Sequence, residues 1–297
     1  EGQTDHVATE EERNAGLSVG QWFKHNAAGP SRLGAYQDAH LPLDEQWMYH
    51  AVADTILAHS LLAALPQVRA DQIGVMGISW GGVIVSTMMG LDGRLAFAIP
   101  TYGTGHKYDI PNYFGNALEN NALYRQLWDP MNWIASSDTP ALWLTWLEEN
   151  NFSHDSQAAT YHQAGGVRQV AIVPDMGHGH AVAWERPESY DFADSVISRG
   201  EPWAVSADVT LSAGVAEAIF ESDRPITSAE LIYSADSGWT GDFNWVTVAA
   251  NLRAGPDGAW IASAPLPPET TGWFFNAYAM STDTENLFGY SDALLVV

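Results

Sequence analysis

The stretch Gly77-Ile78-Ser79-Trp80-Gly81-Gly82 decides the fold, because it contains the pattern G-x-S-x-G. An apolar run, 73–76, precedes it, and a run able to form a helix follows it. A serine held in a sharp turn between a strand and a helix stands clear of the backbone. We expect glycine at 77 and 81 because side chains two residues either side of the serine would collide. The stretch therefore predicts a nucleophile, Ser79, beside helix N–H groups that face developing negative charge.

Composition restricts the class of protein. The chain has 297 residues, 46% of them hydrophobic, enough for one large or two ordinary domains. The 12 Lys and Arg against 36 Asp and Glu give a formal net charge of −24, which disfavours nucleic acid and anionic membranes as partners. The absence of cysteine excludes disulfides and thiolate chemistry. No apolar run is long enough to cross a bilayer, and we expect an extracellular or periplasmic protein without its signal peptide.

Helical and strand patterns alternate over the first two thirds of the chain. We expect helices at 47–65, 155–162 and 187–198, and strands at 73–76, 95–101, 141–145 and 169–173. Asp44 would cap the first of these helices. The alternation predicts a mostly parallel sheet covered on both faces, with ligands bound beyond the carboxyl ends of its strands. The aromatic-rich segment 103–138 lacks a regular period, and we expect it to cover a pocket.

From about Trp203 the sequence changes to short β-type runs separated by turns, the pattern of a small antiparallel sandwich. No combination of histidines and carboxylates occurs there, so we interpret it as accessory. The expected organisation is a catalytic domain over 1–202, whose segment 1–42 is irregular, and an Ig- or fibronectin-like β-sandwich domain over 203–297.

The base that activates the serine should be a histidine. A serine hydroxyl is a poor nucleophile until a base takes its proton. In this strand–turn–helix arrangement the partners follow the serine in the order acidic residue, then histidine. His178 and His180 both follow the last parallel strand. We favour His178, because it lies closer to the strand end and glycines on both sides let its ring reach Ser79.

The acidic partner should follow the strand over 141–145, where Glu148, Glu149 and Asp155 are available. Its task is to accept the imidazole N–H and fix the tautomer. We expect Asp155 to cap the helix near it instead. We favour Glu149, with Glu148 as the alternative.

Metal binding is a competing chemistry for the same residues. The histidines of His178-Gly179-His180, with Glu148 or Glu149, are possible ligands, and the serine turn would then be a coincidence. We favour the serine and expect neither a metal nor another cofactor. A serine peptidase, or a non-catalytic binding or assembly protein on the same scaffold, is the alternative to an ester hydrolase.

Several of these segments resemble the α/β-hydrolases grouped with bacterial acetylxylan esterases, cephalosporin-C deacetylases and dienelactone-hydrolase-like proteins. The resemblance covers about residues 43–200 and is carried by 47–65, 69–82, 90–94 and 176–180; a further segment, 233–239, is similar to part of the β-sandwich that members often carry. It implies an α/β-hydrolase-type sheet and ester hydrolysis by Ser79, His178 and an acidic residue. An acetylated or otherwise esterified carbohydrate is the expected substrate, and the 13 Trp and 11 Tyr suit sugar binding.

The chain departs from the family pattern in two ways. The family usually has Gly-x-x-Asp where this chain has Trp146-Leu147-Glu148-Glu149, so Glu149 takes the place of the aspartate by position. The family also has several strands before the helix at 47–65, and this sequence shows no such strands there. One of them supplies the second donor of the oxyanion hole, the first being the N–H of Trp80.

Without those strands, the strand at 73–76 would be unpaired on one side, where it would expose backbone N–H and C=O groups and invite aggregation. The second oxyanion donor would also be missing, a loss of about 10²–10³ in rate. We therefore expect a second polypeptide to supply the N-terminal strands, either a cleaved part of the same precursor or a separately encoded partner. The alternative is that residues 1–42 cover the edge.

Overall fold

The computed structural model describes residues 30, 36, 38–281, 287–291 and 295–296. The α-helices described are α2 (Trp47–Ala63), α3 (Trp80–Leu91), α4 (Tyr113–Leu118), α5 (His154–Gln163), α6 (His180–Trp184) and α7 (Pro187–Arg199). The strands are β1 (Val75–Ile78), β2 (Ala98–Thr101), β3 (Ala141–Trp146), β4 (Arg168–Val173), β5 (Ala204–Ser212), β6 (Val215–Ser222), β7 (Ser228–Ser234), β8 (Val246–Ala249), β9 (Asn251–Ala254), β10 (Trp260–Pro265), β11 (Gly272–Met280), β12 (Leu287–Ser291) and β13 (Leu295–Val296).

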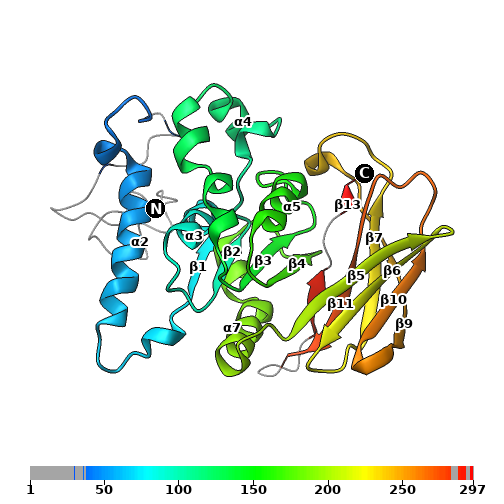
Figure 1. Cartoon of the computed structure of the whole chain (residues 1–297). Helices are drawn as coiled ribbons and strands as arrows, with labels where there is room; N and C mark the ends of the chain where they lie inside the picture. The colour runs from blue at the N-terminus through cyan, green and yellow to red at the C-terminus, as the bar shows by residue number, and fades with distance from the viewer. Residues whose placement is uncertain (1–29, 31–35, 37, 282–286, 292–294, 297) are drawn as a thin grey trace, which may run out of the picture.

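One long sheet runs through the molecule, as Figure 1 shows. Its described strands have the order β1-β2-β3-β4-β12-β11-β7-β8, with β13 also paired to β11. Strands β1 to β4 are parallel, and β12, β11, β7 and β8 are antiparallel to their neighbours. A second, antiparallel sheet has the order β5-β6-β10-β9. The expected portion of four parallel strands followed by a β-rich region is therefore confirmed.

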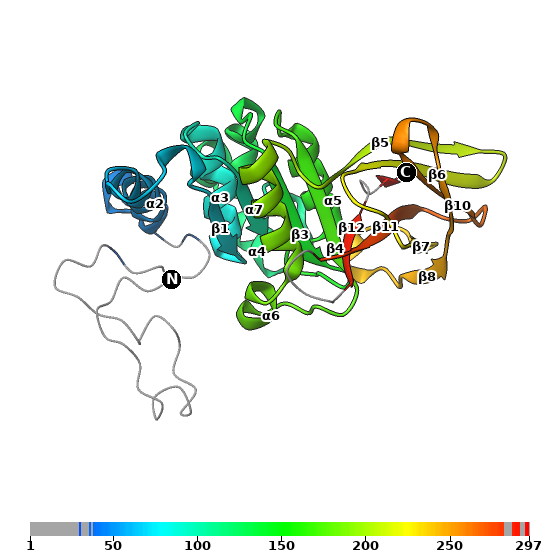
Figure 2. The same cartoon turned by 90° about the horizontal axis from the view of Figure 1, so that it is seen from below.

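Strands β2, β3 and β4 are buried on both faces, which explains their continuous apolar sequences, whereas β1 is half-buried. Along β3, Leu142 and Leu144 belong to one buried cluster, together with Phe192 of α7. Trp143 belongs to a second cluster, with Tyr161 of α5. Helices α7 and α5 therefore cover opposite faces, and Figure 2 shows the parallel strands between helices.

Most predicted elements are found within two or three residues of their expected bounds. The strand expected at 73–76 pairs instead over Val75–Ile78, because Gly77 and Ile78 lie opposite Pro100 and Thr101 in the ladder with β2. The cap prediction was wrong. Asp44 lies in a short 3₁₀ turn, Leu43–Glu45, and Gln46 occupies the N-cap of α2.

The C-terminal region is a sandwich whose larger sheet continues the parallel one. Side chains of β6 and β10 on one sheet and β7 and β11 on the other share one buried cluster, to which Phe220, Leu231, Ala262 and Phe275 belong. The predicted boundary near 202/203 falls between α7 and β5. Strand β12 then returns to pair with β4, at Ser291 opposite Val170.

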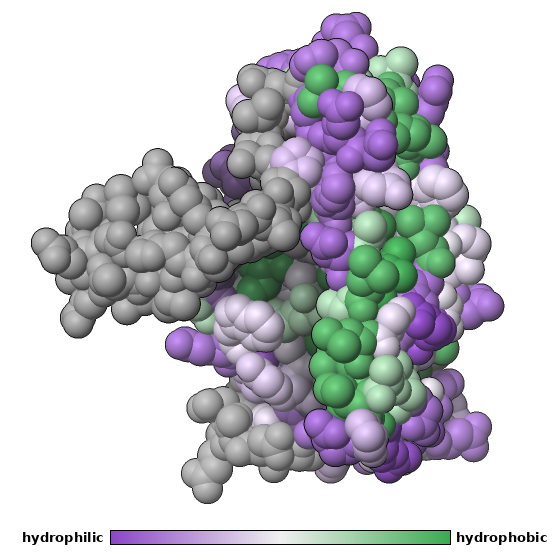
Figure 3. All heavy atoms as spheres, turned by 90° about the vertical axis from the view of Figure 1, so that its left-hand side faces the viewer, coloured by the Kyte–Doolittle hydropathy of each residue, from purple (hydrophilic) through white to green (hydrophobic). Residues whose placement is uncertain are grey.

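Strand β1 is the last strand at its end of the described sheet. Helix α2 lies at the same end of the molecule (Figure 1) and exposes the apolar side chains of Leu57, Leu61 and Leu62. Figure 3 shows apolar side chains gathered on this side of the molecule. Most of the segment 1–42, expected to be irregular, lies outside the described residues. No described helix is long and apolar enough to span a membrane.

Candidate active site

Ser79 lies in a strained turn between β1 and α3. Its φ of 59° and ψ of −121° are unusual for a residue with a side chain. The turn is anchored because the Ser79 N–H donates to the carbonyl of Thr101 at 2.9 Å. A Cβ on Gly77 would lie 2.1 Å from the carbonyl oxygen of Gly81, so glycine is required at position 77.

The expected reason for glycine at 81 was wrong. A Cβ on Gly81 would meet nothing within 4 Å. The second crowded position is Gly82, where a Cβ would lie 2.7 Å from the backbone of Gly103. The close approach that needs glycine is therefore between the elbow helix and the segment after β2.

The structure brings Ser79, His178 and Glu149 together at the carboxyl ends of β1, β4 and β3. Nε2 of His178 lies 3.0 Å from Oγ of Ser79, and Nδ1 lies 2.6 Å from Oε2 of Glu149. These contacts favour the tautomer in which Nδ1–H donates to the carboxylate and Nε2 accepts from the serine. The chain has the α/β-hydrolase fold. This rests on the parallel strands, the serine turn and the order Ser, Glu, His along the sequence.

The other candidates lie elsewhere. Glu148 is exposed, and His180 is exposed at the start of α6. Asp155 accepts hydrogen bonds from the backbone and the hydroxyl of Thr240, and the N-cap of α5 is Ser153. The capping role expected for Asp155 was therefore wrong.

The carboxylate of Glu149 is 1% exposed and accepts four hydrogen bonds. Oε1 accepts from the backbone N–H groups of Asn151 at 2.8 Å and Phe152 at 3.1 Å. Oε2 accepts from Nε1 of Trp146 at 2.8 Å as well as from His178. The residues on both sides of Glu149 thus fold around its side chain, which is longer than that of an aspartate, and fix its direction.

Two rings hold the imidazole of His178. The ring of Tyr102 stacks on it at 4.2 Å, and the ring of Phe152 lies nearly parallel to it at 5.9 Å. The Tyr102 hydroxyl donates to the carbonyl of Gly177 at 2.6 Å, and burial raises its pKa to about 12, so it stays a donor. Tyr102 was not among the sequence candidates. Its place directly after a strand that ends at the site could have indicated it.

Lys107 was also missed. It is fully buried, its Nζ donates to the carbonyl of Asn151 at 2.5 Å, and it lies 3.3 Å from the ring centroid of Phe152. Lys107 therefore links the segment after β2 to the loop that carries Glu149.

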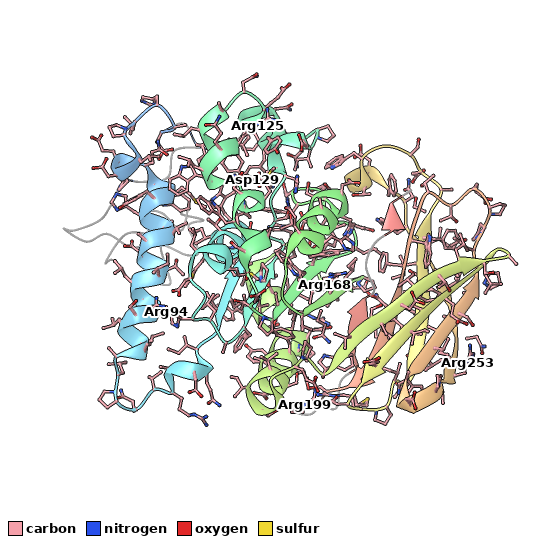
Figure 4. The ribbon with its side chains drawn as sticks, in the orientation of Figure 1. Arg94, Arg125, Asp129, Arg168, Arg199 and Arg253 are labelled. Carbon is pink, nitrogen blue, oxygen red and sulfur yellow. The ribbon has the colours of Figure 1, made fainter. Side chains whose placement is uncertain are left out.

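The segment 103–138 is a set of short helices and turns, including α4. Figure 4 labels Arg125 and Asp129 within it. Asp129 is buried and accepts from the N–H groups of His106 and Met131, while burial raises its pKa. These bonds tie the part of the segment that follows β2 to its later part, around Asp129.

Trp80, the expected oxyanion donor, is the first residue of α3, directly after Ser79. The second donor is expected from the side of β1 away from β2. No described strand lies there, since β1 is at the end of the described sheet. Within the described residues, no set of three His, Asp or Glu side chains is placed to hold a metal ion.

Comparison with known proteins gives matches among solved structures. A scan of protein-family models finds none that matches, and neither does a search of curated proteins. Acetyl xylan esterase 1 from Thermoanaerobacterium sp. JW/SL YS485 is 16% identical, with 60% of this chain and 67% of that chain covered and a TM-score of 0.46. An acetyl xylan esterase from Paenibacillus sp. R4 is 19% identical, with 66% and 76% covered and a TM-score of 0.48.

An acylaminoacyl peptidase from Pyrococcus horikoshii is 23% identical, with 43% of this chain and 23% of that chain covered and a TM-score of 0.37. The expected resemblance to acetylxylan esterases is thus found, and α/β-hydrolases of other activities share it.

Proposed function

We propose that this protein is a serine carboxylic-ester hydrolase that acts through an acyl-enzyme. The observation that carries the proposal is the hydrogen-bonded chain from Ser79 through His178 to Glu149, with contacts of 3.0 and 2.6 Å. Such a chain lets a hydroxyl lose its proton as it attacks and stabilises the imidazolium that forms.

The reaction follows from this geometry in two halves. Oγ of Ser79 attacks the ester carbonyl, Nε2 of His178 takes the hydroxyl proton, and the N–H of Trp80 faces the oxyanion. When the intermediate collapses, the alcohol leaves with the proton from His178, and the acyl group stays on Ser79. Water then attacks the acyl carbon, with His178 as base, and releases the acid. Glu149 keeps Nδ1 protonated throughout.

We propose an acetylated or otherwise esterified carbohydrate as substrate, and an extracellular or periplasmic location for the protein. The support is the resemblance of the sequence and the abundance of aromatic side chains, which suit sugar rings. A serine peptidase is the nearest alternative, because the same chain of three residues attacks amides as well as esters.

The test is turnover by the wild-type protein and by Ser79→Ala. We expect the wild type to hydrolyse p-nitrophenyl acetate, and the variant to lose nearly all of that turnover. A peptide p-nitroanilide cleaved faster than any ester would favour the peptidase. Hydrolysis that survives Ser79→Ala would exclude a serine mechanism, and a wild type that binds esters without turnover would favour a binding protein.

We also propose that strands from a second polypeptide extend the sheet at β1. The support is the position of β1 at the end of the described sheet, together with the exposed leucines of α2. A strand added at that edge would bring backbone N–H groups close to Ser79, where a second oxyanion donor is needed.

A further inference from the structure

A pocket of about 480 Å³ lies where the parallel part of the long sheet meets its antiparallel part. Within the described residues β12 pairs with β4 at one position, where Ser291 lies opposite Val170. The pocket lies at the carboxyl end of β4, between that strand and residues of β7, β8 and β11. Its lining includes Asp175 after β4, Arg186 and Glu188 at the start of α7, Ser228 and Glu230 of β7, and Tyr278 of β11.

The polar groups around the pocket are held in fixed positions. The guanidinium of Arg186 donates to both oxygens of Glu188, at 2.9 and 2.6 Å. The hydroxyl of Tyr278 donates to Oε2 of Glu230 at 2.8 Å. Nδ2 of Asn276, which is 1% exposed, donates to the carbonyl of Ile172 at 2.9 Å. Because these groups are already oriented, a ligand would lose little free energy in ordering them.

The chemistry of the lining disfavours anions and suits a hydroxyl-rich ligand. Arg186 and Glu188 neutralise each other, which leaves Asp175 and Glu230 as the remaining charges. Their carboxylates repel anions and accept hydrogen bonds from hydroxyls. The lining also contains the aromatic ring of Tyr278, beside planar carboxylate, amide and guanidinium groups. A lining of convergent polar groups beside an aromatic surface suits a sugar ring.

The pocket adjoins the proposed active site. Asp175 precedes His178 by three residues in the loop after β4. Arg186 also acts electrostatically on Tyr102, the residue that stacks on His178. The loop that carries His178 therefore also contributes to the pocket.

We propose that this pocket binds a sugar unit of an oligosaccharide whose ester group lies at Ser79. The inference rests on the proposed function, and it adds a second point of substrate contact remote from the ester. The pocket then selects substrates by the length of their sugar chain.

The first test measures binding without turnover. Ser79→Ala is titrated with xylotetraose by calorimetry, alone and combined with Ser228→Trp, which fills the pocket, or with Glu230→Gln, which keeps its shape. We expect the dissociation constant to rise at least about tenfold with the tryptophan and less with the glutamine, since one hydrogen bond to a charged group is weakened. Thr210→Trp, on the exposed side of β5, is the matched control and should leave the constant unchanged.

The second test measures selectivity in the catalytically active protein. We expect Ser228→Trp to lower the ratio of kcat/KM for acetylated xylotetraose to kcat/KM for p-nitrophenyl acetate at least about tenfold, through KM. Thermal unfolding of each variant checks that it folds. Equal binding in all variants, or no binding of xylotetraose, would overturn the proposal that the pocket binds sugar. If no ester is hydrolysed but binding still depends on Ser228 and Glu230, the pocket stands and the proposed function fails.

Discussion

Glu149 is buried, and Oε2 of its carboxylate lies 2.6 Å from Nδ1 of His178. Position in the chain favoured it over Glu148, and this burial and contact explain that preference. The role expected for Asp155 was wrong because its partner, Thr240, lies 85 residues further along the chain. Local sequence holds no trace of such a contact. Lys107 was missed for the same reason, since its neighbours come from α4 (Phe114) and from the loop after β3 (Asn151 and Phe152).

Replacement of Glu149 tests its proposed role as the acidic partner of His178. Glu149→Gln should lower kcat on p-nitrophenyl acetate by about 10³–10⁴, because an amide can stabilise the wrong imidazole tautomer. Asp155→Asn should leave turnover within about threefold, since its carboxylate bonds to Thr240 and not to His178. Steady-state kinetics at neutral pH measures both variants. The reverse pattern would mean that Asp155 is the acid.

Among the elements, the turn from β1 into α3 makes its own prediction. Gly77→Ala should lower the free energy of unfolding by about 2 kcal/mol or more, because the new Cβ would lie 2.1 Å from the carbonyl of Gly81. Gly81→Ala is the matched control. It should be neutral or slightly stabilising, since its Cβ meets nothing and alanine favours helix. Urea unfolding of both variants decides, and similar losses in the two would contradict the assigned packing.

The contact between α2 and the turn after α3 predicts that the free energy of unfolding depends on pH. The Arg94 guanidinium, with help from His59, holds the pKa of Asp92 well below its usual range. Figure 4 labels Arg94, whose Nη1 also donates to Ser60 of α2 at 3.0 Å. Because the pKa of Asp92 is lower in the folded than in the unfolded state, ionised Asp92 stabilises the fold. This stabilisation is complete above the ordinary pKa of aspartate, near 4, and is lost progressively as the pH falls below that value.

Asp92→Asn should therefore cost about 1 kcal/mol at pH 7, a modest value because Arg94 is half exposed. The difference between variant and wild type should shrink at pH 3. Urea unfolding at the two pH values measures it. A difference that stays constant would show that the contact contributes through packing and not through charge.

The sequence predicted the elements better than their ends. The parallel strands and the helix at 47–65 were identifiable because both have regular apolar patterns and strong stop signals such as Pro66. The cap of α2 was not, because Asp44 sits in a separate turn that the local sequence does not distinguish from a helix start. The need for glycine at 82 was also hidden, since it depends on Gly103, 21 residues later.

For the whole molecule, the continuity of the long sheet was beyond the sequence. Short β-type runs predicted a sandwich, but the return of β12 to β4 depends on a pairing between distant segments. The pocket proposed to bind sugar is lined by residues from both the parallel and the antiparallel part of that sheet. The proposal therefore gives the C-terminal region a part in substrate binding.

The proposed second polypeptide is tested on the assembly itself. Active material should elute from gel filtration above the mass of this 32.3 kDa chain, and intact mass spectrometry should find a second component. Leu61→Lys, on the exposed face of α2, should disrupt the assembly, whereas Leu211→Lys, exposed on β5, should not. A lone 32.3 kDa species with full esterase activity would refute the proposal.

The account depends most on acylation of Ser79. Wild-type protein is mixed with p-nitrophenyl acetate, quenched in acid while turnover proceeds, digested and examined by mass spectrometry. We expect an acetyl group on the peptide that contains Ser79, and none there in Ser79→Ala. Turnover that leaves Ser79 unmodified, or an acetyl group that turns over on another residue, would contradict the account.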